Sequence, residues 1–489
     1  MLWFVALSRL FLGFVMTAQA DAPPAISANL ERPDLILKHV IDLFDGSRAT
    51  DPAAALAAWK LATNGSISLG KGTEAAIAAL NPRMIPELAN LEAARAVFDF
   101  DPAGKPDWSF TVSHDDGTFS AFATAMALTD GAREPEIDGA DVDRTGPPGS
   151  AMIANKGDAV IVASSREAIA RALKTIAPVA KPSDDAGIVF AIDADALIRA
   201  QSVSWKRAGE AMKGLNLPKI DGRLKVDADR LFLAIETPAA EPGAIQSRDR
   251  AWDRELSNRA SIVFSTSLDT SPKNLDRWFA MADRVEKADP AKSKLNPLRA
   301  RVNILATASR INLERDLWPH LRGVSGFLLG DSRRPSGIGI ALHMRDKDSA
   351  MKIRRDVLPS LMKALRLDQN LAVSVIESEG ATAWIVWGEK AREELAIVRS
   401  DPRLSITAAA EAKPPENENR MIVIHPGRLG LATEGSPLDR AVAEAPPIIW
   451  RGSCRDGKQT DRVTIAHFRP MIKRFLDEIP QKTASAPAR

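Results

Sequence analysis

The sequence predicts an α+β fold with two tandem, distantly related domains, each a mainly antiparallel or mixed sheet covered by helices. The first observation behind this prediction is internal similarity: residues 159–173 and 383–397 both read as an apolar strand that continues into a helix. The second is that strand patterns often come in pairs joined by short turns, which is typical of antiparallel sheets. The third is the length of 489 residues, which exceeds what one ordinary core holds.

The internal similarity extends to further segments that keep the same order along the chain. The other matching pairs are 86–100 with 316–330, 189–197 with 421–429, and 227–236 with 459–468. In the last pair three residues are identical at matching positions: Asp229, Arg230 and Ala234 recur as Asp461, Arg462 and Ala466. We therefore interpret the chain as an internal repeat.

The repeat also sets the domain boundaries. Residues 237–256 are rich in Pro, Gly, Ala and charged residues, which is the composition of a linker, and an apolar strand pattern follows at 261–268. We place a first α+β domain at 21–250 and a second at 251–480. We expect residues 481–489 to form a disordered tail.

The N-terminal residues 1–20 have the pattern of a signal peptide. The apolar run ends in Ala18-Gln19-Ala20, the small-x-small pattern of a signal-peptidase site. A membrane anchor is the alternative, but Arg9 leaves the run short of the ~20 apolar residues that span a bilayer. We expect cleavage after Ala20, export to the periplasm or extracellular space of a bacterium, and no integral membrane domain after cleavage.

Two segments of the first unit resemble ligand-binding loops. Residues 65–73 look like a P-loop, but Gly72 stands where a Mg²⁺-binding hydroxyl is needed, so we interpret them as a glycine-rich turn. Asp141 and Asp143, with Thr145 and Gly146, match the first half of a calcium loop. The glutamate that would complete that loop is replaced by Met152, which favours a solvated acidic loop.

The acidic, Pro- and Gly-rich stretch from Asp130 to Gly149 is predicted to be a long loop. The second unit has a helix pattern after Asp346 instead. Loops of this length tend to be functional or disordered, so this is where we expect function first.

Helix and hairpin signals support the remaining elements. Ser164 and Glu167 have the spacing of a capping box at the start of a helix, and Gly388 takes that place in the second unit. Residues 224–235 read as strand, tight turn and strand. Ser271-Pro272 predicts a helix start, and the apolar face of that helix has the width to cover a sheet.

Charge bears on nucleic-acid binding, and cysteine content bears on disulfides and thiol reactivity. The formal net charge is +2, and basic residues are interspersed with acidic ones, so we expect no nucleic-acid partner. Cys454 is the single cysteine, which excludes an intramolecular disulfide. No neighbouring base or helix start is evident in the sequence, so we expect an unreactive thiol.

No catalytic motif accompanies the repeat. Ser325 lacks the Gly-x-Ser-x-Gly spacing, and His343 and His467 sit in strand patterns. Carboxylate pairs such as Asp99 with Asp101 or Asp193 with Asp195 are too common to single out a dyad. Trp384 and Trp387 point to opposite faces of a strand, so at least one belongs to the core. We assign no catalytic, cofactor-binding or metal-binding residue and no cofactor.

The segment Gly157–Ala168 reads as a hairpin strand entering a capped helix, and 383–397 repeats the pattern. With the duplicated α+β unit and the signal sequence, it resembles uncharacterised exported bacterial proteins grouped as domains of unknown function. The resemblance is carried by this segment and its repeat and implies no catalytic residues. It implies a non-enzymatic role in the cell envelope.

Two functional hypotheses remain. The leading one is an exported, non-catalytic envelope protein that binds or scaffolds an unknown envelope protein or ligand. The alternative is an exported hydrolase whose active residues converge at the junction of the two domains, where pockets are favoured.

Overall fold

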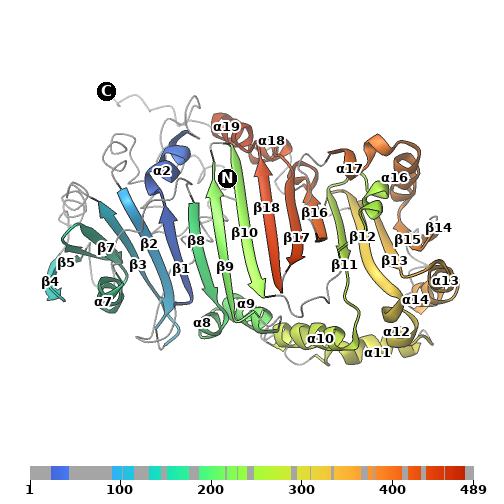
Figure 1. Ribbon diagram of the computed structural model, residues 1–489, viewed down its shortest axis with the longest axis horizontal. Coiled ribbons are helices and arrows are strands. Elements are labelled where there is room, and N and C mark those ends of the chain that lie inside the picture. The colour runs from blue at the N-terminus through green and yellow to red at the C-terminus, as the bar shows by residue number, and fades with distance from the viewer. Residues whose placement is uncertain are drawn as a thin grey trace, which may run out of the picture.

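The structure is a computed structural model that gives the protein one large antiparallel sheet with helices around it (Figure 1). It describes residues 24–42, 91–101, 103–114, 132–144, 151–175, 187–214, 217–227, 229–238, 247–287, 295–308, 310–331, 335–364, 373–377, 380–409, 417–430, 437–455 and 457–478. Residues 1–20, 65–73 and 481–489, for which the sequence makes predictions, lie outside these ranges.

The sheet has 18 strands in the described residues. Those before residue 250 are β1 (Ile26–Glu31), β2 (Leu91–Phe100), β3 (Pro106–His114), β4 (Ala132–Ile137), β5 (Ala140–Arg144), β6 (Met152–Lys156), β7 (Ala159–Ala163), β8 (Gly187–Asp193), β9 (Lys219–Val226) and β10 (Arg230–Pro238). Those after it are β11 (Ile262–Ser267), β12 (Leu321–Gly330), β13 (Pro335–Met344), β14 (Val373–Glu377), β15 (Thr382–Trp387), β16 (Glu418–Ile424), β17 (Ile448–Arg455) and β18 (Lys458–Ala466).

The strands follow an order that reads similarly from both ends of the sheet. From one edge to β10 the order is β4, β5, β6, β7, β3, β2, β1, β8, β9, β10. From β18 to the other edge it is β18, β17, β16, β11, β12, β13, β15, β14. Because β10 pairs with β18, the sheet continues without a break across the middle of the molecule (Figure 1).

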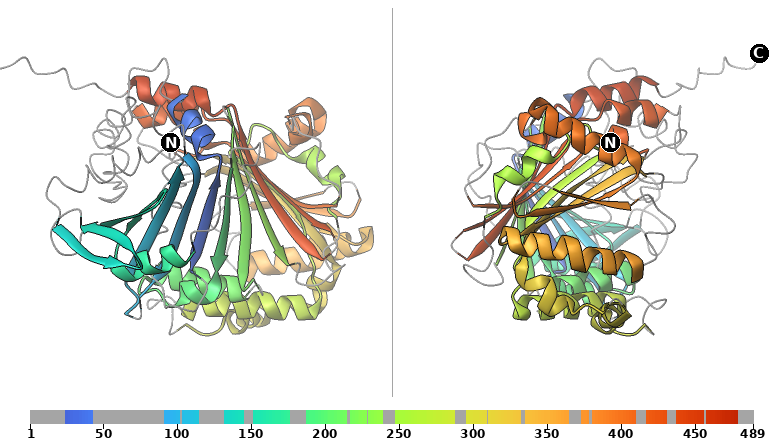
Figure 2. Two further views of the ribbon diagram at one scale, coloured as in Figure 1. Left: turned by 60° about the vertical axis from the view of Figure 1, so that its left-hand side comes forward. Right: turned by 90° about the vertical axis from the view of Figure 1, so that its right-hand side faces the viewer.

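Helices gather at the two ends of the strands, and the sheet between them is strongly twisted and curved (Figure 2). The helices before residue 250 are α2 (Pro33–Asp42), α7 (Arg166–Lys174), α8 (Ala194–Ile198) and α9 (Val203–Gly214). The later ones are η2 (Arg250–Glu255), α10 (Pro272–Lys287), α11 (Leu298–Ala308), α12 (Leu313–Asp316), η3 (Trp318–His320), α13 (Lys347–Lys352), η4 (Ile353–Val357), α14 (Leu358–Ala364), α16 (Glu389–Ser400), η5 (Pro402–Leu404), α17 (Ile406–Ala409), η6 (Pro426–Arg428), α18 (Pro437–Ala443) and α19 (Arg469–Glu478).

The apolar core is divided among several clusters. One cluster lies under α16 and includes the buried side chains of Phe327, Trp384 and Leu395. Another lies under α8 and α9 and includes Phe98 and Met212. We call the face of the sheet that carries Phe327 and Trp384 the α16 face. The clusters formed by the described residues each draw their side chains from one side of residue 250.

The coarse prediction of an α+β fold is confirmed, and so are most of the paired elements. The segment 159–173 contains β7 and α7, and 383–397 falls on β15 and α16. The hairpin predicted at 224–235 is formed by β9 and β10. The helix expected after Asp346 begins there, since the Asp346 carboxylate accepts a hydrogen bond from the backbone N–H of Ser349 at 2.7 Å.

The predicted loop from Asp130 to Gly149 is wrong for most of its length. Residues 132–144 form the hairpin of β4 and β5, which extends the sheet beyond β6. The turn at Asp138 and Gly139 has positive φ at both residues, as a tight two-residue hairpin requires. The charged residues that suggested a loop instead occupy an edge, where charge and proline discourage pairing with other chains.

The start of α7 lies one residue later than predicted. Ser165, not Ser164, is the N-cap, and its hydroxyl accepts a hydrogen bond from the N–H of Ala168 at 3.1 Å. Ser164 instead accepts one from the N–H of Trp108 at 2.7 Å and so ties the helix start to β3. Glu167 therefore falls outside the capping-box position.

The helix predicted after Ser271 is α10, but its apolar face does not cover the sheet. α10 packs against α9 and α11 along the ends of the strands. Trp278, which was expected on the sheet-covering face, is 47% exposed. Helical periodicity shows which residues share a face of a helix, whereas the packing partner depends on the connection between elements.

Candidate functional site

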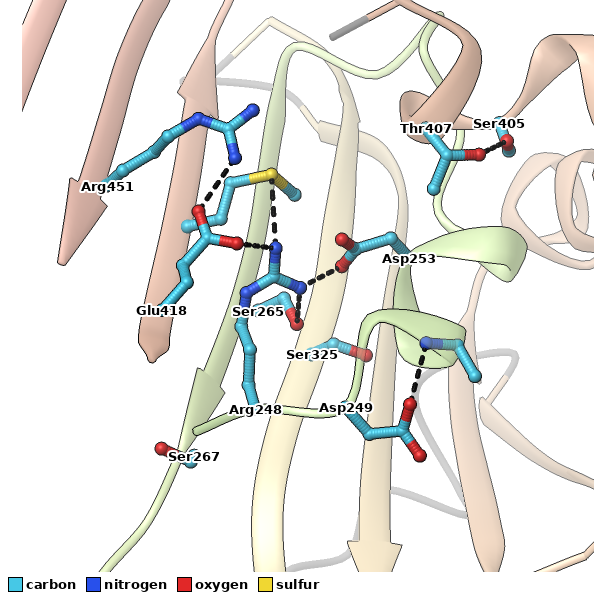
Figure 3. Close-up of polar contacts among 12 residues, drawn as sticks. Arg248, Asp249, Asp253, Ser265, Ser267, Ser325, Ser405, Thr407, Glu418 and Arg451 are labelled. Atoms are coloured by element: carbon cyan, nitrogen blue, oxygen red, sulfur yellow. Dashed lines mark hydrogen bonds and ion pairs between the residues drawn. The ribbon is translucent and has the colours of Figure 1, made fainter. Parts of the chain in front are cut away.

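Among the described residues, the largest group of buried charges lies on the α16 face, around Arg248. Arg248 donates hydrogen bonds to Asp253 at 2.5 Å, to Ser265 at 3.3 Å and to Glu418 at 2.6 Å (Figure 3). Arg451 donates to the other carboxylate oxygen of Glu418 at 2.7 Å. The cluster therefore joins the segment before η2 to β11, β16 and β17.

This cluster is sealed from solvent and self-neutralised. The side chains of Arg248 and Glu418 are 1% and 2% exposed. Burial works against the charge on Arg248, but the carboxylates of Asp253 and Glu418 outweigh it and raise the pKa of Arg248. Two guanidinium groups facing two carboxylates leave no net charge for a ligand, so the cluster locks residues 248–253 onto the sheet.

A second polar row lies beside this cluster. The hydroxyl of Ser325 on β12 is hydrogen-bonded to Nε2 of His343 on β13 at 2.7 Å. The other ring nitrogen of His343 is hydrogen-bonded to the hydroxyl of Thr382 on β15 at 3.1 Å. Ser325, His343 and Thr382 thus have the connectivity in which a base is placed between a nucleophile and an orienting group.

Trp252 of η2 closes this row. Its ring stacks on the imidazole of His343 with 4.1 Å between ring centroids and 2° between planes. A side chain at Gly323 would collide with the same indole, so glycine is required beneath it. Ser325 is fully buried and His343 is 3% exposed, which leaves no approach for a substrate.

The protonation of His343 also argues against catalysis. Burial, with a contribution from Arg322, lowers the pKa of His343 to about 3. The imidazole is therefore neutral near pH 7 and is a weak base for the Ser325 proton. The hydrogen bonds among Ser325, His343 and Thr382 instead satisfy polar side chains that are buried in the sheet.

The opposite face of the sheet carries an unbroken row of apolar residues that pair directly across fourteen strands. We call it the apolar row. In sheet order it consists of Val160, Val112, Ala94, Leu30, Ile188, Leu224, Leu233, Val463, Trp450, Ile422, Phe264, Gly326, Ile340 and Ile385.

The two parts of the apolar row differ in exposure. On the first part every residue except the half-buried Leu30 is buried, and Val112 and Leu224 are 2% and 3% exposed. From Leu233 to Ile385 every residue of the row except the buried Gly326 is half-buried, and Ile385 at its end packs against the core cluster under α13 and α14. We call this second stretch the open part of the row. A neighbouring row on the same face is also half-buried or exposed, and consists of Ile424, Ile262, Leu328, Ile338 and Trp387.

Of the calcium-like residues, Asp141 and Asp143 lie on a strand, whereas Thr145 and Gly146 lie outside the described residues. Asp141 and Asp143 lie on β5, opposite Asn155 and Ile153 of β6. The carboxylate of Asp141 is bonded to Arg133. Within the described ranges, no group of three metal-ligating side chains is present.

The carboxylate pairs also separate into different roles. Asp193 caps α8 by accepting from the N–H of Ala196 at 2.8 Å, and Asp195 is paired with Lys213. Asp101 accepts from the N–H of Lys105 at 2.8 Å in a turn. Asp99 is buried, and burial, opposed by Arg199 and Arg171, raises its pKa to about 7.

The other sequence candidates are structural or isolated. Trp384 is fully buried and Trp387 is 37% exposed, as their alternation predicted. Burial raises the pKa of the Cys454 thiol, which is the opposite of what a reactive thiol needs. His467 follows β18 and is hydrogen-bonded to Asp229 at 2.7 Å.

No helix in the described part of the chain has the length and hydropathy to cross a membrane.

Comparisons with known proteins do not assign the chain to a family. No protein-family model matches the chain, and no curated protein matches its sequence. A solved structure, crystal form I of TP0453, is similar at 9% identity over 45% of this chain and 77% of that chain, with a TM-score of 0.25.

The sequence analysis missed both the buried charge cluster around Arg248 and the apolar row. Arg248 and Trp252 lie in the stretch that composition marks as a linker, yet Arg248 is 5% exposed. The apolar row had a visible signal: VFAI, IVF, FLL, IAL, WIV and MIVI are apolar at consecutive positions. Strands with both faces apolar must be covered on both faces or leave one face for a ligand.

Proposed function

We propose that this protein is an exported, non-catalytic binding protein of the cell envelope, and that the open part of the apolar row is its binding surface. The observation that carries the proposal is the change in exposure along one continuous row: five of its six residues before Leu233 are buried, whereas seven of its eight residues from Leu233 onward are half-buried. Large contiguous apolar surfaces of this kind mark sites of interaction. Export rests on the predicted signal peptide at 1–20.

We also propose that the two halves arose by duplication and meet at a pseudo-twofold axis. The support is the register of β10 and β18, where Arg230 pairs with Ala466 and Ala234 pairs with Arg462. The sequence alignment makes Arg230 equivalent to Arg462, and Ala234 equivalent to Ala466, so the pairing exchanges equivalent residues. An isologous contact has this property. The axis passes beside the Phe232 and Thr464 pair.

A hydrolase remains the second candidate, and the hydrogen-bonded row of Ser325, His343 and Thr382 is the observation that favours it. All three residues come from strands after residue 250, so this row is not at a junction between the halves. Turnover would require Trp252 to leave the ring of His343 while the ion pairs of Arg248 hold its segment in place.

The binding proposal is tested with Nile red, an uncharged dye whose fluorescence rises in apolar surroundings. We expect the folded full chain to enhance its fluorescence and the Ile340→Lys variant to lose most of the enhancement. The matched control is Ile304→Lys on α11, where the wild-type side chain is 63% exposed and lies outside the row. An unaltered signal in Ile340→Lys would remove the apolar row as the binding surface.

Export and catalysis have separate tests. Mass spectrometry of the protein recovered from the periplasm should find Asp21 as the first residue, and an intact Met1 in a membrane fraction would contradict the signal peptide.

If the hydrolase candidate is correct, a fluorophosphonate probe labels Ser325 in the wild type and fails to label Ser325→Ala. We expect no labelling of either.

A further inference from the structure

We infer that the open part of the apolar row binds a long alkyl chain, such as that of a fatty acid. This inference rests on the binding function proposed above and adds the chemical class of the ligand. It follows from the charge, hydrogen-bonding capacity and shape of the surface between Leu233 and Ile385.

The surface offers almost no polar group to a partner. From Leu233 to Ile385 the row contains aliphatic and aromatic side chains and one glycine. The indole N–H of Trp450 is its single side-chain donor, and it is already donated to Asp461 at 2.9 Å. A protein interface of ordinary composition carries about one hydrogen bond per 100–200 Å². An occupant that needs no hydrogen bonds suits this surface better.

An ion pair that borders the row on the same face, Arg420 with Asp461, is self-neutralised. Arg420 lies two residues before Ile422 on β16, and it donates a hydrogen bond to Asp461 at 2.7 Å. Its guanidinium also lies 5.5 Å from the centroid of the Trp450 ring, where a cation is favoured. This ion pair therefore leaves no unbalanced charge beside Ile422 and Trp450, which favours binding there through the alkyl chain rather than through an ionic headgroup.

The shape of the surface is long and narrow. The open part of the row crosses β10, β18, β17, β16, β11, β12, β13 and β15, and strands are spaced about 4.8 Å apart, so it extends roughly 34 Å. The second apolar row, from Ile424 to Trp387, doubles its width over part of that length. An extended chain can lie along such a strip.

The curvature of the sheet distinguishes this site from a membrane-docking surface. Helices stand at both ends of the strands, and the sheet between them is twisted and curved (Figure 2). A flat bilayer would meet these helices before it reached the strands between them. A single chain reaches the strip without that obstruction.

The test uses the full chain in detergent-free buffer and a series of saturated fatty acids from octanoic to hexadecanoic acid, measured by displacement of Nile red. Burial of each added CH₂ contributes about 0.8 kcal/mol, so we expect affinity to rise roughly tenfold for every two CH₂ groups. Hexadecanol should bind about as tightly as hexadecanoic acid, because the row makes no ionic contact. This chain-length series needs no substitution and is unaffected by misfolding of a variant.

Lysine substitutions inside and outside the apolar row test where the alkyl chain binds. Ile340→Lys and Ile422→Lys should each weaken hexadecanoic acid binding by at least tenfold, whereas Ile304→Lys should leave it unchanged. Circular dichroism and the melting temperature of each variant establish that it is folded.

The outcomes separate the two proposals. If Nile red binds at Ile340 but fatty acids of every length fail to displace it, the alkyl-chain inference is overturned and the binding function stands, with an apolar segment of a protein as the remaining occupant. If Nile red itself does not bind, both proposals fail. Affinity that depends on the carboxylate but not on chain length also overturns the inference.

Discussion

Arg248 shows what a single charged side chain can contribute when it is buried with partners on several elements. Replacing it by alanine leaves the carboxylates of Asp253 and Glu418 buried without their shared cation. Removing one member of a buried ion pair costs about 3–5 kcal/mol. We therefore expect Arg248→Ala to lower the free energy of unfolding by about that amount, measured by urea denaturation.

The matched control for this substitution is Arg133→Ala. The Arg133 side chain is 72% exposed and pairs with Asp141 on the surface hairpin. Exposed ion pairs contribute about 0–1 kcal/mol, so this variant should unfold at nearly the wild-type urea concentration. Equal effects of the two substitutions would contradict the assigned role of Arg248.

Asp99 gives the stability of the fold a dependence on pH. Its pKa is raised from 3.8 to about 7 by burial, against the opposing effects of Arg199 and Arg171, and its Oδ2 atom is buried without a hydrogen-bond partner. The folded chain therefore binds this proton more tightly than the unfolded chain. The stability that this provides is complete below about pH 4 and is lost as the pH rises through 7.

The Asp99→Asn variant isolates this contribution. It should be more stable than the wild type at pH 8, by at most about 4 kcal/mol, and should lose that advantage toward pH 4. Urea denaturation at a series of pH values measures the difference. Asp195→Asn, which alters an exposed carboxylate, is the control. A difference between Asp99→Asn and wild type that stays constant with pH would rule out a titrating Asp99.

At the scale of elements, α7 and α16 begin in different ways although each directly follows a strand of the sheet. α7 has a side-chain cap from Ser165, whereas α16 begins after Gly388 with φ +87° and no side-chain cap. Gly388→Ala is expected to lower stability by about 1–2 kcal/mol, because it places a Cβ in a left-handed conformation 3.0 Å from the carbonyl oxygen of Ser336. The change in melting temperature measures it.

A substitution at another glycine tests what causes the loss of stability expected for Gly388→Ala. Gly457 also has positive φ, +75°, but lies in the turn between β17 and β18. If backbone conformation alone sets the penalty, Gly457→Ala and Gly388→Ala should cost similar amounts. A larger effect at Gly388 assigns the excess to the contact with Ser336.

Elements were predictable where a local signal sufficed. The hairpin of β9 and β10 and the helix that begins after Asp346 depend on neighbours in sequence, and both predictions are confirmed. The hairpin at 132–144 was missed because its acidic and Pro-rich composition matched a loop, while its pairing with β6 depends on a partner strand. The covering role of α10 was wrong because α9, far away in sequence, supplies its contact.

At the scale of the whole molecule, the pairing of β10 with β18 can be tested in the full chain. Phe232 and Thr464 face each other in this register, and directly opposed strand residues are close enough for a disulfide. With Cys454 replaced by serine, the Phe232→Cys, Thr464→Cys double variant should oxidise to an intramolecular disulfide. The bond should raise the free energy of unfolding by about 2–4 kcal/mol, the typical contribution of a disulfide, because it restricts the unfolded chain.

The control for this cross-link is Phe232→Cys with Ile465→Cys, whose side chains point to opposite faces of the sheet. Non-reducing electrophoresis and mass spectrometry distinguish the oxidised forms. Efficient cross-linking of the control pair, with none in the Phe232 and Thr464 pair, would show a different register.

The candidate sites were less predictable than the fold. Ser325 and His343 could be named from the sequence, but their hydrogen bond depends on the register of β12 and β13, and their burial depends on Trp252. The apolar row could be anticipated from strands that are apolar on both faces. Which part of it stays open depends on the packing of helices that sequence periodicity does not place.

The position of Arg248 in the chain has a consequence for the order in which the protein is made. Glu418 lies 170 residues further on. At synthesis rates of about 5–20 residues per second, Arg248 leaves the ribosome roughly 10–30 s before its partner does. Until then the Arg248 guanidinium lacks its Glu418 partner, so the ion pairs that hold residues 248–253 on the sheet form only after β16 has been made.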